Sequence, residues 1–249
     1  CGFGKSVIQA VLEGKVEQLV LVNCCDSMRR VYDIVESTGK CKFLYMLDMP
    51  HEDNDCEKVK LAQGIHRLKK AYEKFSGKTF DRSGFLNAFS HEPVDNQPYI
   101  GVLGVRVSGI LEKMIRDNIR MDVENLTCTG GRRLAVIREE LEKMEDDAMF
   151  LAYADALLSQ MPCFRMNNST RRNRLYLDPN LKGIIYHTIK FCDYYGFEYA
   201  SIKRDIKVPL LKIETDFTSQ SAGQLLTRVQ AFAETLEGSE AVSYTHLTL

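Results

Sequence analysis

The sequence predicts an α/β protein built from two domains with parallel sheets. Three observations lead to this fold class. Short apolar runs indicate buried strands, amphipathic stretches between them indicate helices, and a polar, turn-rich segment separates two such series. Strands that alternate with helices are typical of a parallel sheet, because neighbouring parallel strands need a crossover connection, usually a helix.

The first domain is expected over residues 1–96. Apolar runs at Gln18–Val22 and Phe43–Leu47 predict two buried strands. Amphipathic stretches at Ser27–Glu36 and Cys56–Phe75 predict the helices that follow them. This order of elements is that of a parallel α/β unit.

The segment Phe80–Pro98 is polar and rich in turn-forming residues, and it marks the expected domain boundary. The second domain is expected over residues 97–238. Its predicted strands are Tyr99–Val107, Met121–Glu124, Gly183–His187 and Val208–Glu214, and its predicted helices are Ile110–Asn118, Leu134–Leu158 and Ser221–Leu236.

Both ends of the chain look unnatural. The chain opens on Cys1 rather than on methionine, so we expect an upstream segment. Residues 239–249 follow a turn-like Gly238, show no core-facing period and resemble a translated sequencing adaptor. We therefore expect a non-native tail there and leave it, with His246, out of the fold prediction.

The composition is that of an ordinary globular protein, with 45% hydrophobic residues, 27% charged residues and a net charge of −1. A charge so close to zero gives no electrostatic reason to expect nucleic acid or an anionic membrane as a partner. No apolar run approaches the ~20 residues that cross a bilayer, and no leader sequence is visible. We expect a cytoplasmic protein.

The chain contains eight cysteines. A cytosolic protein keeps its thiols reduced, so disulfides are not expected. Buried inert thiols, a metal or cluster site and a catalytic thiol remain as interpretations. Several of the cysteines stand beside Gly, Pro or Asp at apparent strand ends, which favours a cluster; no catalytic residue is assigned.

Ligands of open parallel sheets bind beyond the carboxyl ends of the strands, where loops converge. The cysteines that stand in such loops are Cys24, Cys25, Cys163 and Cys192, and Cys128 in a Gly-rich turn. No C-x-x-C run is present, which argues against a ferredoxin or a zinc ribbon. Cys41 and Cys56 lie at a strand start and in a helix, where we expect structural roles.

Five ordered blocks carry a resemblance to a known family. They are N-C-C-D-S-M-R-R from Asn23, M-P-C-F-R-M from Met161, G-I-I-Y-H-T-I-K-F-C-D from Gly183, and K-I-E-T-D-F from Lys212 with Q-L-L-T-R-V-Q-A-F from Gln224. With these blocks the chain resembles the 2-hydroxyacyl-CoA dehydratase and benzoyl-CoA reductase family, of the D-component type. The resemblance runs from Cys1 to about Gly238.

The resemblance implies flavodoxin-like (Rossmann-like) domains with an oxygen-sensitive iron–sulfur cluster in a crevice between them. In dehydratase subunits three cysteines hold a 4Fe–4S cluster, and they correspond here to Cys1, Cys25 and Cys192. The open iron would bind the thioester carbonyl of a 2-hydroxyacyl-CoA, and one electron would give a ketyl radical that expels the hydroxyl group. An ATP-hydrolysing iron–sulfur activator protein would supply the electrons, and a homologous subunit would complete a hetero- or homodimer.

Three further cysteines go beyond that pattern: Cys24, Cys128 and Cys163. The double-cubane branch of the same family holds two sulfide-bridged cubanes (8Fe–9S) with three thiolates each, six in all, and it reduces small molecules with an ATP-driven reductase. Adjacent side chains of an extended loop point in different directions, so Cys24 and Cys25 could serve different cubanes. A radical dehydratase, a double-cubane reductase and a non-catalytic electron relay all stay open.

Two further expectations concern single residues. The sulfurs of Cys25, Cys163 and Cys192 are expected to face one crevice between the domains. His187 ends a predicted buried strand five residues before Cys192, and it is either a hydrogen-bonded core histidine or a residue that supports the cluster. Gly101 and Gly104 match no dinucleotide-binding motif, so no nicotinamide cofactor is expected.

Overall fold

A computed structural model of the chain describes residues 1–87, 97–130, 138–167, 169–216 and 222–245. Its contacts divide the chain into two compact units. The two-stranded unit, named for its sheet, comprises Phe3–Pro93 and Arg133–Arg172, and the four-stranded unit comprises Cys1–Gly2, Val94–Arg132 and Asn173–Leu249. Among the described residues, no helix combines the length and the apolar character needed to span a bilayer.

The first helix of the two-stranded unit is α1 (Gly2–Leu12), although its first residue, Gly2, is grouped with the other unit. The sheet of the two-stranded unit consists of two parallel strands, β1 (Gln18–Val22) and β2 (Phe43–Leu47). The helix α2 (Asp26–Thr38) connects the strands and buries Met28, Val31 and Val35. The left-handed φ of +61° at Gly39 ends this helix, a conformation that glycine adopts without a steric cost.

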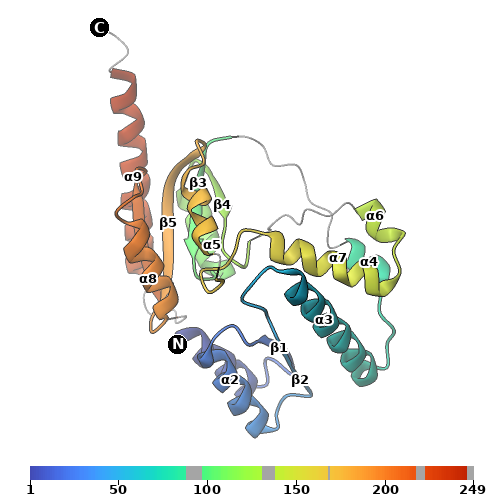
Figure 1. Ribbon diagram of the computed structural model, residues 1–249. Coiled ribbons are helices and arrows are strands. Elements are labelled where there is room, and N and C mark those ends of the chain that lie inside the picture. Colours follow the sequence, from blue (N-terminus) through green and yellow to red (C-terminus); the bar gives the residue numbers. More distant parts are fainter. Residues whose placement is uncertain (88–96, 131–137, 168, 217–221, 246–249) are drawn as a thin grey trace. The chain divides into compact units, whose positions relative to one another are not determined.

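A second core of this unit lies between helices. The helices α3 (Asp55–Ser76) and α7 (Asp146–Ser159) pack side by side, as Figure 1 shows, with α4 (Arg82–Asn87) and α6 (Arg138–Glu142) nearby. Leu61, Met149 and Phe150 are almost fully buried there. Asn54 caps α3 by accepting a hydrogen bond from the Glu57 N–H (3.0 Å), as N-cap residues do.

The four-stranded unit contains a parallel sheet in the order β4-β3-β5-β6. The strands are β3 (Tyr99–Gly104), β4 (Asp122–Asn125), β5 (Leu181–Ile189) and β6 (Leu210–Thr215). The helices α5 (Gly109–Asn118) and α9 (Ala222–Thr245) cover one face, and α8 (Asp193–Ile202) covers the other. A 3₁₀ helix, η1 (Ser169–Tyr176), precedes β5.

Neighbouring residues of β5 show how both faces of this sheet are buried. Ile185 packs with the α5 and α9 residues Ile115 and Val229, whereas Ile184 packs on the opposite side with the α8 residue Ile202. Successive side chains of a strand point to opposite faces, so a strand covered by helices on both sides must be apolar throughout. This explains the unbroken apolar runs in the sequence.

The predicted α/β class is therefore confirmed, and every predicted strand is present within a few residues of its expected place. The strand predicted through Val107 ends earlier, at Gly104, whose φ of +93° turns the chain. The helices α1, α4 and α8 were not predicted. The helix α9 continues through Gly238 and Ser239 to Thr245, so the prediction of a turn there was wrong.

The structure also groups the chain differently from the expected domains at two places. Cys1–Gly2, expected in the first domain, belong to the four-stranded unit. Residues 133–172, expected in the second domain, form a compact unit with Phe3–Pro93, because α7 packs along α3. Parts of several predictions lie outside the described residues: 88–96 of the boundary segment, 134–137 of a helix, Phe217 of one block, Ser221 of the last helix, and 246–249 of the tail with His246.

Candidate functional site

Cys24 and Cys25 stand at the carboxyl end of β1, between that strand and α2. Cys25 is the N-cap residue of α2, with an extended backbone (φ −166°, ψ 166°). The thiol of Cys24 donates a hydrogen bond to the sulfur of Cys25. The two side chains therefore interact, and the assignment of Cys24 and Cys25 to different cubanes stays a prediction.

This contact separates the acidities of the two thiols. The hydrogen bond from Cys24, together with the nearby backbone N–H groups of Met28 and Ser27, lowers the pKa of Cys25 to about 6. The same hydrogen bond, and then burial, raises the pKa of Cys24. A thiolate at the positive end of a helix is the form of cysteine that binds metals and reacts as a nucleophile.

Cys163 belongs to the same unit and lies close to the pair. It is half-buried beyond the end of α7, in a turn closed by a hydrogen bond from the Met166 N–H to the Cys163 carbonyl oxygen (2.9 Å). A negative charge on Cys163 raises the pKa of Cys24, and the positive charge of Arg165 lowers it. The two-stranded unit thus gathers Cys24, Cys25 and Cys163.

Cys192 occupies a matching place in the four-stranded unit. It follows β5 and is the N-cap residue of α8, where its N–H donates to the Ile189 carbonyl oxygen (3.0 Å). The preceding Phe191 has a left-handed φ of 65° and is 81% exposed. Few residues other than glycine adopt this conformation, so the turn presents Cys192 at some conformational cost.

Cys1 lies near the same strand end, because the next residue is anchored there. The Gly2 N–H donates to the carbonyl oxygen of Lys190, which is two residues before Cys192 (3.4 Å). A Cβ atom on Gly2 would come within 2.6 Å of the Asp216 carbonyl oxygen, so only glycine fits. The sequence therefore brings Cys1 to the carboxyl ends of β5 and β6.

Cys128 follows β4 in a tight, hydrogen-bonded turn. The Thr127 hydroxyl donates to the Asn125 side chain (2.7 Å), and a Cβ atom on Gly130 would collide with the Asn125 carbonyl oxygen. Cys128 itself is exposed. The rest of its Gly-rich motif, from Gly131, lies outside the described residues.

The remaining two cysteines stand elsewhere. Cys41 precedes β2 at its amino end, packs against the α2 core and has a pKa raised by burial. Cys56 is exposed in the first turn of α3. Neither follows the carboxyl end of a strand, in agreement with their exclusion from the candidate ligands.

In the described parts of the chain, no group of three or more His, Cys, Asp or Glu side chains is arranged to hold a single metal ion. The single-cubane ligand set draws on both units, Cys25 from the two-stranded unit and Cys1 and Cys192 from the four-stranded unit. The convergence of Cys25, Cys163 and Cys192 on one crevice stays a prediction.

His187 is a buried, hydrogen-bonded residue of the sheet, 1% exposed. Its Nδ1 lies 3.0 Å from the Arg106 carbonyl oxygen, and its Nε2 lies 2.8 Å from the Thr215 hydroxyl. Burial lowers its pKa to about 4, so the ring is neutral at pH 7. The expectation of a hydrogen-bonded core histidine is confirmed, and a supporting role near a cluster stays a prediction.

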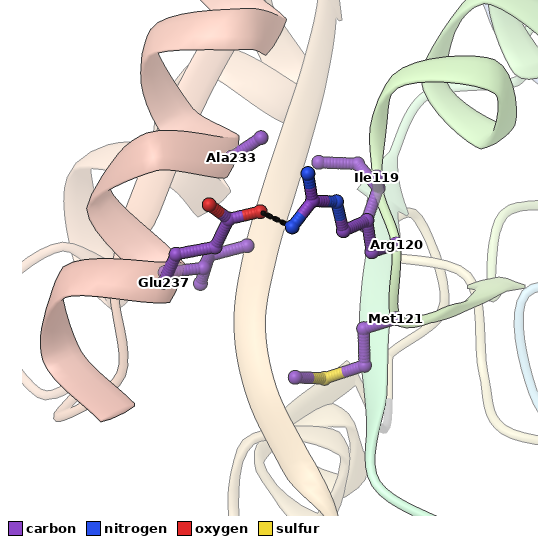
Figure 2. A pocket seen from close by; sticks show the side chains of 6 residues that line it. Ile119, Arg120, Met121, Ala233 and Glu237 are labelled. Atoms are coloured by element: carbon purple, nitrogen blue, oxygen red, sulfur yellow. Dashed lines mark ion pairs between the residues drawn. The ribbon is translucent and has the colours of Figure 1, made fainter. Parts of the chain in front are cut away.

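A pocket of about 290 Å³ lies in the four-stranded unit. It is lined by Ile119, Arg120, Met121, Ala233, Leu236 and Glu237. Figure 2 shows the Arg120–Glu237 ion pair (3.1 Å) that crosses it. Because Met121 directly precedes β4, the pocket is at the amino end of that strand, whereas Cys128 follows the carboxyl end.

Two residues that act beside the thiols of the two-stranded unit were not predicted from the sequence. Asn23 links the end of β1 to the loop after β2 through its side-chain amide, and Arg165 places a positive charge near Cys24. Asn23 stands in the N-C-C-D block and Arg165 in the P-C-F-R block, so both blocks contained the signal.

These features define an α/β protein that carries thiols at the carboxyl ends of its parallel strands, and comparison with known proteins identifies the family. The model of the 2-hydroxyglutaryl-CoA dehydratase D-component family matches residues 1–93 and 94–236. The chain belongs to this family.

Two curated proteins are similar to parts of the chain. A putative dehydratase subunit, YjiM of Escherichia coli (strain K12), is 28% identical over 153 residues, which are 57% of this chain and 39% of that protein. The (R)-phenyllactyl-CoA dehydratase beta subunit of Clostridium sporogenes is 40% identical over 57 residues, 22% of this chain and 15% of that protein. The matched regions thus span well under half of either relative.

Proposed function

We propose that the chain is part of the iron–sulfur subunit of a 2-hydroxyacyl-CoA dehydratase-type enzyme, a lyase that uses low-potential electron chemistry. One observation carries the proposal: Cys25 and Cys192 each follow a parallel strand and begin the next helix, in a chain of the dehydratase D-component family. Such a position favours the thiolate over the thiol, and thiolates are the ligands of iron–sulfur clusters.

The donor set fits a cluster. Six cysteines stand beyond strand or helix ends, and they divide evenly between the units: Cys24, Cys25 and Cys163 in one, and Cys1, Cys128 and Cys192 in the other. Cys1, Cys25 and Cys192 would hold a 4Fe–4S cluster. When bound, such a cluster supplies single electrons at low potential and an iron that can bind a thioester carbonyl.

The protein's own residues have separate tasks in this proposal. The helix N-terminus at Cys25 and the hydrogen bond from Cys24 keep the Cys25 sulfur deprotonated for iron. The backbone of Gly2, fixed beside Lys190, keeps Cys1 near Cys192. Electrons would come from an ATP-hydrolysing activator protein, and a homologous subunit would complete the CoA thioester site.

A second candidate is a double-cubane reductase of small molecules, and the even division of six thiols favours it. Each unit carries three cysteines, the number that each cubane of a bridged 8Fe–9S cluster requires. In this case Cys24, Cys128 and Cys163, which a single cubane leaves without a task, become ligands. The same activator chemistry would drive it, without a CoA substrate.

The two candidates differ in their substrates, which gives the test. The full-length protein, prepared without oxygen, is combined with its homologous subunit, an ATP-dependent activator and a reductant, and a 2-hydroxyacyl-CoA is added. The dehydratase proposal expects an unsaturated acyl-CoA to form only when ATP is present. Absence of dehydration, together with ATP-dependent reduction of a small molecule such as acetylene, would contradict it in favour of the double-cubane reductase.

A further inference from the structure

The loop between β2 and α3 is hydrogen-bonded on one side to Asn23. We call residues 48–53 the bridging loop. The Asn23 Nδ2 donates to the Asp48 carboxylate (2.5 Å), and the Asn23 Oδ1 accepts a hydrogen bond from the Met49 N–H (2.9 Å). The Asn23 N–H also donates to the Leu47 carbonyl oxygen (3.2 Å). The residue before Cys24 is thus fixed to the bridging loop at two points and to the last residue of β2 at a third.

On its other side the bridging loop holds the segment that follows Cys163. The Asn167 N–H donates to the His51 carbonyl oxygen (2.8 Å), and the Arg165 carbonyl oxygen lies 3.1 Å from Nδ1 of His51. The Arg165 guanidinium donates to the Pro50 carbonyl oxygen (3.4 Å). Two side-chain pairs extend the contact, Asn167 with Glu52 (2.9 Å) and Arg171 with Asp53 (2.8 Å).

All of these residues belong to the two-stranded unit. Cys24 directly follows Asn23, and Cys163 stands two residues before Arg165. The bridging loop therefore connects the two segments that carry the three thiols. The influence of the Cys163 charge on the pKa of Cys24 agrees with a short separation between them.

The side chain of Asn23 has a particular chemical task in this connection. It must donate to a carboxylate and accept from a backbone N–H at the same time, and a side-chain amide has both groups. An aspartate would keep the acceptor but face Asp48 with a second negative charge. An alanine would lose both hydrogen bonds.

We propose that Asn23, paired with Asp48, is a positioning residue that sets the spacing between the Cys24-Cys25 turn and Cys163. This proposal rests on the proposed function, because the spacing of these thiols matters only if they are ligands of a cluster. The spacing itself can be measured without iron. A test on cluster-free protein therefore separates a failure of this proposal from a failure of the cluster assignment.

The experiment uses a short bifunctional thiol reagent on anaerobic, cluster-free protein, with peptide mapping of the link between Cys163 and the Cys24-Cys25 pair. The wild type is expected to give this link. Asn23→Ala is expected to reduce its yield about fivefold, the effect of losing roughly one net hydrogen bond. A long reagent should link the same cysteines in both proteins, because the unit stays folded.

A donor–acceptor exchange distinguishes positioning from a general loss of stability. Asn23→Asp alone should lower the yield as Asn23→Ala does. Adding Asp48→Asn should restore it, because the amide introduced at position 48 can donate to the carboxylate introduced at position 23, which still accepts from Met49. Asn118→Ala, which removes an amide bonded to Met114 and Gln230 in the other unit, should change nothing.

The outcomes separate cleanly. An unchanged link in a folded Asn23→Ala protein, or an exchange variant no better than Asn23→Asp, overturns the proposal. If Asn23→Ala does not fold, the comparison of Asn23→Asp with the exchange variant decides. The full-length protein could give the expected cross-link yields and yet take up no iron. This result would support the positioning role of Asn23 and contradict the cluster assignment.

Discussion

Cys25 and Cys192 occupy the same position in their respective units. Each is the third residue after a parallel strand, since β1 ends at Val22 and β5 at Ile189, and each is the N-cap of the following helix. Each is also followed by an aspartate. Two separate strand–helix turns therefore present a cysteine in the same backbone context.

This shared position has an electrostatic consequence. The first N–H groups of a helix have no partners within the helix, and with the aligned peptide dipoles they favour a negative charge at the N-terminus. A cysteine at this point is more readily deprotonated, as iron ligation requires. Cys128 is also the third residue after its strand, β4, but it stands in a turn and shares only this position with Cys25 and Cys192.

The lowered pKa of Cys25 predicts its reactivity in cluster-free protein. Because the folded pKa is about 6, Cys25 is mostly thiolate at pH 7, whereas burial raises the pKa of Cys41. Iodoacetamide should alkylate Cys25 about tenfold faster than Cys41 at pH 7, as mass spectrometry of the peptides would show. Measured as a function of pH, the alkylation rate of Cys25 should have its midpoint at a higher pH in Cys24→Ala than in the wild type, because the hydrogen bond from Cys24 is lost. A wild-type midpoint at or above the pKa of an ordinary thiol would contradict the lowered pKa.

The Cys24→Ala protein also separates the two cluster types. The double-cubane candidate, in which Cys24, Cys25 and Cys163 of one unit are all ligands, predicts that Cys24→Ala loses iron together with any reductase activity. The single cubane held by Cys1, Cys25 and Cys192 predicts that Cys24→Ala keeps its iron. Cys56→Ala, at an exposed helix position, is the matched control and should keep its iron. Full iron retention in Cys24→Ala would reduce Cys24 to a hydrogen-bond donor to Cys25 and favour the single cubane.

His187 predicts a dependence of stability on pH. Its pKa is about 4 in the folded protein and 6.5 ordinarily, so between these values the unfolded chain binds more protons and the free energy of unfolding rises with pH. The contribution is about 3 kcal/mol, present above pH 6.5 and lost as the pH falls to 4. Denaturant unfolding of wild type and His187→Gln across this range would measure it. Parallel pH profiles for the two proteins would contradict the assignment.

Gly104 predicts a large cost for a single methyl group at the end of β3. Its φ is +93°, and a Cβ atom there would lie 2.1 Å from the His187 carbonyl oxygen. Gly104→Ala should lower the free energy of unfolding by about 2 kcal/mol or more. The control Gly109→Ala adds its methyl group to open space at the start of α5 and should be neutral or slightly stabilising. Similar stabilities of the two variants would show that the turn at Gly104 tolerates a side chain.

The strands could be predicted because burial on both faces leaves an unbroken apolar run, as in β3, where all six residues are buried. The helix α8 was missed for a related reason. Its sequence, D-Y-Y-G-F-E-Y-A-S-I, combines aromatic residues with a central glycine, so local propensity does not indicate a helix. Packing of Tyr199 and Ile202 on the sheet stabilises it instead.

The candidate site could be predicted in part. The rule that ligands bind beyond the carboxyl ends of parallel strands was enough to select Cys25 and Cys192. The roles of Asn23 and Arg165 depend on hydrogen bonds to residues 25 and 115 positions away, which no local pattern reveals. The grouping of α7 with α3 was missed for the same reason, because it depends on contacts between distant segments.

The most direct test of the account is the iron and sulfide content of the full-length protein, purified without oxygen, compared with its Cys192→Ser and Cys56→Ser variants. We expect about four irons per chain for a single cubane or about eight for a double one, unchanged in Cys56→Ser and lost in Cys192→Ser with the helical content preserved. Wild-type protein without iron, or Cys192→Ser with its full iron content, would contradict the account.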